Sequence, residues 1–161
     1  MRWLILISTL LLAIVILTAH LWFSEQTSLP LLFGYRNNAV LDFWSVHHFL
    51  AGIVIGRVAL QKFKKPLLFV SAVLFVALTW EGLELLMEAG KMGLVVATWK
   101  EGFEHWGNRF IGDFLAVMLG GLVARRYHQL WKYALIYCLV WFTLNAAMPN
   151  SMYIQSVILE R

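Results

Sequence analysis

The chain of 161 residues is 61% hydrophobic and only 14% charged, with a net charge of +4. A soluble domain carries about 45–50% apolar and about 25% charged residues, and the apolar excess here falls in long runs, so we expect an integral membrane protein. The positive charge does not indicate a nucleic-acid partner, because the cations concentrate in short clusters at residues 61–65 and 124–132, each beside an apolar run.

Apolar runs occur at five places, and all but the fourth, which is short for a full span, approach the length of about 20 residues that a helix needs to cross a membrane. We therefore expect an all-α fold, a polytopic bundle of five transmembrane helices that forms one membrane domain over residues 1–161. The first run exceeds the apolar part of a signal peptide, about 7–15 residues, so we expect it to stay uncleaved. The predicted helices cover about residues 3–23, 41–60, 66–88, 110–124 and 130–148.

The connections between the predicted helices differ in charge. Arg2 and the clusters at 62–65 and 125–132 are basic, whereas the other two connections mix basic residues with glutamates. Basic connections lie on the cytoplasmic side, so we expect a cytoplasmic N-terminus and a C-terminus on the outside. Residues 89–109 mix Leu, Val and Trp with Lys and Glu, which is typical of an interfacial or re-entrant segment.

Polar side chains gather in the outer halves of three predicted helices. A charged side chain at membrane depth costs about 2.5–3.5 kcal/mol, so such residues usually face the interior of a bundle and find partners there. We therefore expect a polar pocket in the outer half of this bundle. Its candidate members are His47, His48, Glu81, Glu84, Asn108, Arg109 and Asp113.

Helical spacing predicts which of these residues share a face. Glu81 and Glu84 are three positions apart and share one face, which Glu88 continues towards the water. Arg109 and Asp113 are four positions apart, so they can pair directly.

The adjacent histidines diverge by about 100° on a helix and cannot point at one site. His48 lies at steps of four from Gly52 and Gly56, whose face allows a neighbouring backbone to approach closely. We therefore expect His48, rather than His47, in the pocket, and close packing of the second helix on the fourth. The fourth helix repeats the small-residue spacing at Gly112, Ala116 and Gly120.

Other polar residues have simpler explanations. Asp42 is expected to cap the second helix, and His20 to anchor the end of the first helix at the interface. Glu101, Glu104 and His105 would form one solvated face if their segment is helical.

The polar motifs resemble those of the VanZ-like family of small bacterial membrane proteins. The resemblance covers residues 42–125 and includes the stretch RFIGDFLAVMLGG at 109–121, although Val117 stands where that family usually has an asparagine. It implies a bacterial cytoplasmic (inner) membrane protein of the cell envelope, acting on envelope lipids or in resistance to glycopeptide antibiotics. The matching positions are His47 or His48, Glu84, Arg109, Asp113 and Gly120.

Three classes of function fit this pocket. In the first, the protein binds or modifies an envelope lipid or lipid-linked molecule, with a divalent metal or acid–base catalysis as the two chemical options. In the second it is a structural or assembly subunit, with a membrane-complex partner or a second copy; in the third it is a small proton- or cation-coupled transporter. The candidate catalytic and metal-binding residues are His48, Glu81, Glu84 and Asp113, and the candidate substrate-binding residues are Arg109, Asn108, His47 and Trp80.

Overall fold

The computed structural model describes residues 2–24, 28–92 and 103–147, and within these ranges the chain is mostly helical, which confirms the all-α prediction. Residues 93–102 of the predicted interfacial segment 89–109 lie outside the described residues. The helices are α1 (Arg2–Phe23), α2 (Trp44–Lys62), α3 (Pro66–Glu88), α4 (Asp113–Arg126) and α5 (Trp131–Ala147); the shorter elements are strands β1 (Leu31–Phe33) and β2 (Ala39–Leu41) and a π-helix, η2 (Asn108–Gly112).

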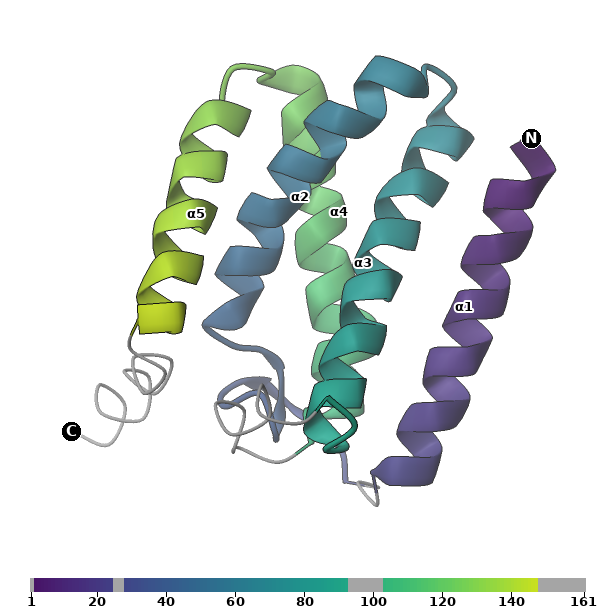
Figure 1. Cartoon of the computed structure of the whole chain (residues 1–161), viewed down its shortest axis with the longest axis vertical. Helices are drawn as coiled ribbons and strands as arrows, with labels where there is room; N and C mark the ends of the chain where they lie inside the picture. The colour runs from purple at the N-terminus through teal and green to yellow at the C-terminus, as the bar shows by residue number, and fades with distance from the viewer. Residues whose placement is uncertain (1, 25–27, 93–102, 148–161) are drawn as a thin grey trace.

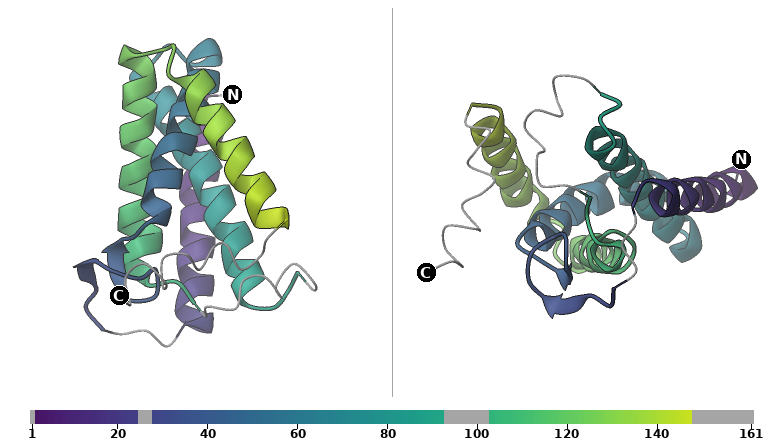
Figure 2. Two further views of the ribbon diagram at one scale, coloured as in Figure 1. Left: turned by 90° about the vertical axis from the view of Figure 1, so that its left-hand side faces the viewer. Right: turned by 90° about the horizontal axis from the view of Figure 1, so that it is seen from below.

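The helices stand side by side and alternate in direction along the chain (Figure 1). The most extensive helix–helix contact joins α2 and α4, while α1 packs on α3 and α5 packs on α2. The segment that carries β1 and β2 lies over one end of the bundle, next to η2 (Figure 2). At that end α1 and α3 finish and α2 begins, so chain segments distant in sequence are brought together there.

Glycines allow α2 and α4 to approach so closely. A Cβ atom on Gly52 would overlap the carbonyl oxygen of Val117, and one on Gly120 would overlap the carbonyl oxygen of Phe49. Both obstacles are backbone atoms, which cannot turn aside as a flexible side chain can. The predicted close packing of the second and fourth helices is therefore confirmed.

The start of α2 differs from the prediction. It begins at Trp44 rather than near residue 41, because the residues before it belong to β2. Strand β2 pairs with β1 in parallel, Leu31 opposite Ala39 and Phe33 opposite Leu41. No strand was predicted, since each is only three residues long and its partner is a neighbouring loop segment.

Asp42 stabilises the first turn of α2 from just outside the helix. Its carboxylate Oδ1 accepts the backbone N–H of Ser45 at 3.0 Å, and the Ser45 hydroxyl accepts the Asp42 N–H at 3.1 Å. This reciprocal pair resembles a capping box. The predicted capping role of Asp42 is therefore confirmed, with Asp42 two residues before Trp44, the first residue of α2.

The fourth helix is extended at its start by the π-helix η2. The prediction began it at residue 110, whereas the helical chain runs without a break from Asn108 through η2 into α4 and ends at Arg126. Gly112, at the end of η2, lies so close to the Val40 carbonyl oxygen of β2 that a side chain there would overlap it. Single π turns occur often at functional sites, and this one carries Arg109.

Two helices among the described residues are long and apolar enough to cross a membrane, namely Trp3–Phe23 and Pro66–Glu88. Only 11% of the residues in the most apolar stretch of Trp3–Phe23 are buried, so most side chains of this helix face outward. These two helices support the membrane location in part. The helices at the other three predicted spans are not both long and apolar enough. The apolar stretch of α5, Trp131–Leu144, is too short.

Candidate functional site

Charged and polar side chains from α2, α3 and α4, from the π-helix η2 and from two connections meet at the end of the bundle near β1 and β2. We call this group the charge cluster. Each of its side chains is at most 10% exposed, so the group is withdrawn from solvent. Its members are Arg36, His48, Glu81, Glu84, Glu88, Glu104, Arg109 and Asp113.

Arg109 forms the centre of the charge cluster. Its Nη2 atom lies 3.0 Å from both carboxylate oxygens of Glu88 and 3.0 Å from Oε2 of Glu104. Its Nε atom lies 3.4 Å from Oε2 of Glu81, and Nη1 lies 3.0 Å from Nδ1 of His20. A guanidinium group has five N–H donors in a fixed plane, so it suits several carboxylates at once.

The direct pair that the spacing of Arg109 and Asp113 allows does not form. The guanidinium turns instead to the three glutamates, and among the described residues it forms no ion pair with Asp113. Asp113 faces His48, whose Nε2 lies 3.4 Å from its Oδ2. The other ring nitrogen of His48, Nδ1, lies 3.8 Å from Oε1 of Glu81.

Arg36 joins the charge cluster from the connection between β1 and β2. It forms an ion pair with Glu88 and lies 3.8 Å from Oε2 of Glu104. Although burial works against its charged form, the carboxylates of Glu104 and Glu88 raise the pKa of Arg36 above its ordinary value. Burial raises the pKa of Glu104, an effect that Arg109 and Arg36 oppose in part. Burial also raises the pKa of Asp42.

The two adjacent histidines occupy different surroundings. His48 lies in the charge cluster, on the side that its glycine register predicts. His47 lies among aromatic rings instead, with its ring centroid 4.3 Å from that of Trp141 and 5.3 Å from that of Tyr137. The candidate residue Asn108 lies beside the charge cluster, where its side-chain amide donates to the Val40 carbonyl at 3.2 Å.

Several members of the site were placed in solvent or at an interface by the sequence analysis, and these predictions are wrong. Glu88 was expected near water, yet its side chain is fully buried. Glu104 was expected on a solvated face and is 2% exposed. His20 was expected as an interfacial anchor and is 1% exposed, in contact with Arg109. The helical spacing of Glu88 from Glu84 was the one signal that could have placed it.

His105 is also buried rather than solvated, and it holds the connection before η2 in place. Its Nδ1 accepts the backbone N–H of Gly107 at 3.0 Å, and its Nε2 lies 3.1 Å from the Ser28 carbonyl oxygen. Its own backbone N–H donates to the Arg36 carbonyl at 2.8 Å. The third member of this predicted face, Glu101, lies outside the described residues.

Two sets of side chains in the charge cluster have the composition and spacing of metal ligands. The first set is His48, Glu81 and Glu84, and the second is Glu81, Glu104 and Asp113. In each set, one donor atom per residue lies within 4.8 Å of the others. Glu81 belongs to both sets, and the other three predicted catalytic and metal-binding residues, His48, Glu84 and Asp113, each belong to one of them.

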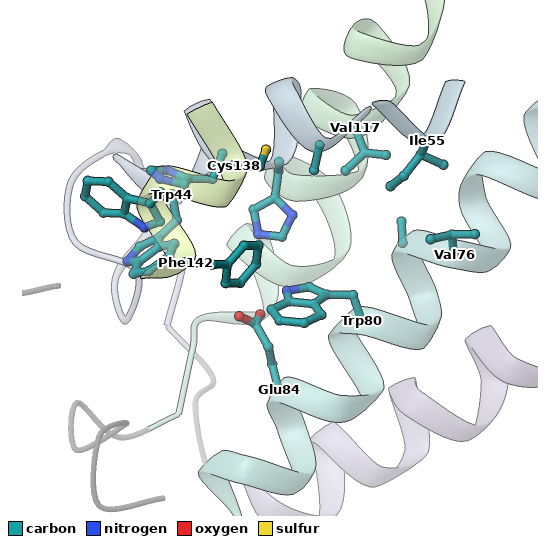
Figure 3. A pocket seen from close by; sticks show the side chains of 13 residues that line it. Trp44, Ile55, Val76, Trp80, Glu84, Val117, Cys138 and Phe142 are labelled. Carbon is teal, nitrogen blue, oxygen red and sulfur yellow. The ribbon is translucent and has the colours of Figure 1, made fainter. Parts of the chain in front are cut away.

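An apolar cleft of about 290 Å³ opens between α2, α3 and α5 (Figure 3). The candidate substrate-binding residues Trp80 and His47 line it, and so does Cys138, the single cysteine of the chain. Figure 3 shows the carboxylate of Glu84 beside the indole of Trp80, with which it forms a hydrogen bond. Most of the remaining wall is aliphatic or aromatic.

A second, much smaller cavity of about 10 Å³ lies at the charge cluster and is lined by Arg36, Trp44, His48, Glu84 and Glu104. Trp44, His48 and Glu84 line both this cavity and the apolar cleft. The cleft therefore ends at the charge cluster, with an imidazole and a carboxylate at the boundary.

No family model, curated protein or solved structure matches this chain. The resemblance to the VanZ-like family therefore stays a prediction, and any functional conclusion depends on the geometry of the site.

Proposed function

We propose that this chain is an integral membrane protein that binds a lipid-class amphiphile, with an acyl chain in the apolar cleft and a polar head group at the charge cluster. The outer surface of the bundle supports the membrane location, and the shape of the cleft supports the binding of an amphiphile.

The outer surface of the bundle supports a membrane location. On α4, the side chains Leu115, Leu119 and Leu122 are 47–55% exposed and follow one another at helical spacing. On α1, Leu10 is 63% and Val15 62% exposed. Exposed apolar patches of this kind mark contact with a membrane or a protein partner.

The basic residues support an orientation for all five helices as spans. Lys62 ends α2 and Lys64 and Lys65 follow it, while Arg125 and Arg126 end α4. These cations therefore lie at the end of the bundle opposite the charge cluster. With basic connections in the cytoplasm, the N-terminus is cytoplasmic, and the charge cluster faces the outer leaflet of what we propose to be a bacterial inner membrane.

The main support for amphiphile binding is that the apolar cleft and the polar cavity share three lining residues, Trp44, His48 and Glu84. The cleft volume of about 290 Å³ is close to the lower limit of about 300 Å³ for small-molecule sites, which suits one acyl chain. An apolar compartment that ends at fixed polar groups matches the two chemical halves of an amphiphile.

Thiol labelling of Cys138 tests this proposal in the native chain. We expect a single-chain lysophospholipid to slow the reaction of Cys138 with a small maleimide, because both occupy the same cleft. At about ten times its Kd the lipid leaves roughly a tenth of the clefts open, so labelling should slow about tenfold. The measurement is the labelling rate, followed by mass spectrometry, in a lipid-free detergent with and without the lysophospholipid.

Two variants of α2 provide the control. Ala51 lines the cleft, so Ala51→Trp fills it and should abolish the protection by lipid. Val58 is 55% exposed on the same helix and does not line the cleft, so Val58→Trp should leave the protection intact. A labelling rate that saturating lipid does not change, in an otherwise folded protein, would refute the proposed function.

A further inference from the structure

The charge cluster holds more carboxyl groups than its two arginines can balance. Five carboxyl side chains are buried within it, against Arg36 and Arg109. If all of these groups were ionised, a buried negative excess would remain, and uncompensated buried charge is strongly unfavourable. The cluster must therefore hold protons or bind cations. The carboxyl groups belong to Glu81, Glu84, Glu88, Glu104 and Asp113.

Asp113 shows where a cation would act. Its side chain is fully buried, and neither of its oxygens has a hydrogen-bond partner among the described residues. Its nearby base is His48, at 3.4 Å and not in hydrogen-bonding geometry. Leaving a buried acceptor without a donor costs about 1–3 kcal/mol, and more for a charged group. A carboxylate oxygen of Asp113 also lies within 4.8 Å of oxygens of Glu81 and Glu104, so it points into the cluster.

We propose that the charge cluster binds two divalent metal ions, one held by His48 and Glu84, the other by Glu104 and Asp113, with Glu81 bridging both. Both ligand sets contain Glu81, and a carboxylate has two oxygens with which to bridge neighbouring ions. Carboxylates with one imidazole suit Mn²⁺, Fe²⁺ and Zn²⁺. Helical bundles that hold pairs of iron or manganese ions likewise direct Glu and His side chains inward from facing helices.

The arginines fit this arrangement. Arg36 and Arg109 both pair with Glu88, which belongs to neither ligand set. Arg109 also contacts two of the proposed ligands, Glu81 and Glu104, and so it would hold their carboxylates in place beside the ions. His48 and Glu84 also line the apolar cleft, so one ion would lie at its polar end. Metal binding does not depend on the proposed lipid, and each proposal can fail without the other.

Manganese titration of the full chain in detergent, after removal of bound metal with a chelator, tests the proposal. We expect two Mn²⁺ per chain by elemental analysis and an electron paramagnetic resonance spectrum of two exchange-coupled ions, because the ions share Glu81. Glu81→Gln should abolish the coupled spectrum, and His48→Asn should lower the affinity for Mn²⁺ at least tenfold. Thermal unfolding of each variant reports whether it is folded.

His128→Asn is the matched control, since it changes the same residue type at an exposed position between α4 and α5, outside the charge cluster. It should bind Mn²⁺ as the wild type does. The proposal is overturned if the wild-type chain binds no Mn²⁺, which would leave shared protons as the answer to the charge excess. Binding of a single uncoupled ion would overturn the proposal as well, and so would an equal loss of Mn²⁺ affinity in His128→Asn and His48→Asn.

Discussion

Replacement of Arg109 by methionine is expected to lower the free energy of unfolding by about 3–5 kcal/mol, the usual cost of removing one partner from a buried ion pair. The guanidinium contacts Glu81, Glu88 and Glu104, and all of these side chains are at most 3% exposed. Methionine fills a similar volume but offers no donor, so the carboxylates lose their shared partner. The measurement is denaturant-induced unfolding of the purified protein in detergent.

Arg126→Met is the control for that experiment. Arg126 is the exposed last residue of α4, the helix that continues η2, so the same substitution should change stability by less than about 0.5 kcal/mol. Equal losses in the two variants would mean that the charge cluster does not depend on Arg109 as its geometry indicates.

Gly120→Ala is expected to destabilise the bundle by about 1–3 kcal/mol, as overpacking of a tight contact does. The added methyl group would overlap the carbonyl oxygen of Phe49 on α2, and it would lie 2.9 Å from the backbone nitrogen of Ile53. Both neighbours are backbone atoms of a helix, so α2 and α4 must separate to admit the methyl group. Thermal or denaturant unfolding measures the effect.

The adjacent glycine provides a matched control. A Cβ atom at Gly121 would lie 3.5 Å from Phe69 Cζ, which is ordinary van der Waals contact. Alanine favours a helix over glycine by about 1 kcal/mol at either position, so Gly121→Ala should be neutral or stabilising. If Gly120→Ala were equally harmless, the close approach of α2 and α4 would not limit stability.

The parts of the fold that depend on local periodicity could be predicted from the sequence. The predicted range of α3, 66–88, agrees with the structure, because Pro66 marks its first residue and a long apolar run follows. The glycine spacing of α2 also predicted its packing on α4. Strands β1 and β2 and the π turn of η2 were not predicted. These elements depend on contacts with other segments of the chain rather than on a local periodicity of the sequence.

In the charge cluster, too, the residues on helices could be predicted from the sequence and the residues in connections could not. Glu81, Glu84 and Asp113 could be proposed as neighbours because their helices have a definite direction and depth. Arg36 and Glu104 could not, since they lie in connections, where no periodicity tells which way a side chain points. His20 was missed for a different reason: its place at the end of a lone apolar helix matches an interfacial anchor as well as a buried partner of Arg109.

The construction of the charge cluster from distant segments has a consequence for biosynthesis. The ribosome completes α3, with its three cluster glutamates, before it reaches η2, so at that stage Arg36 is the one cluster arginine already made. Arg109 arrives only with η2, and the acidic residues gain their central partner last. A nascent chain that stops after α3 therefore keeps three poorly neutralised carboxylates, and we expect cellular quality control to degrade it.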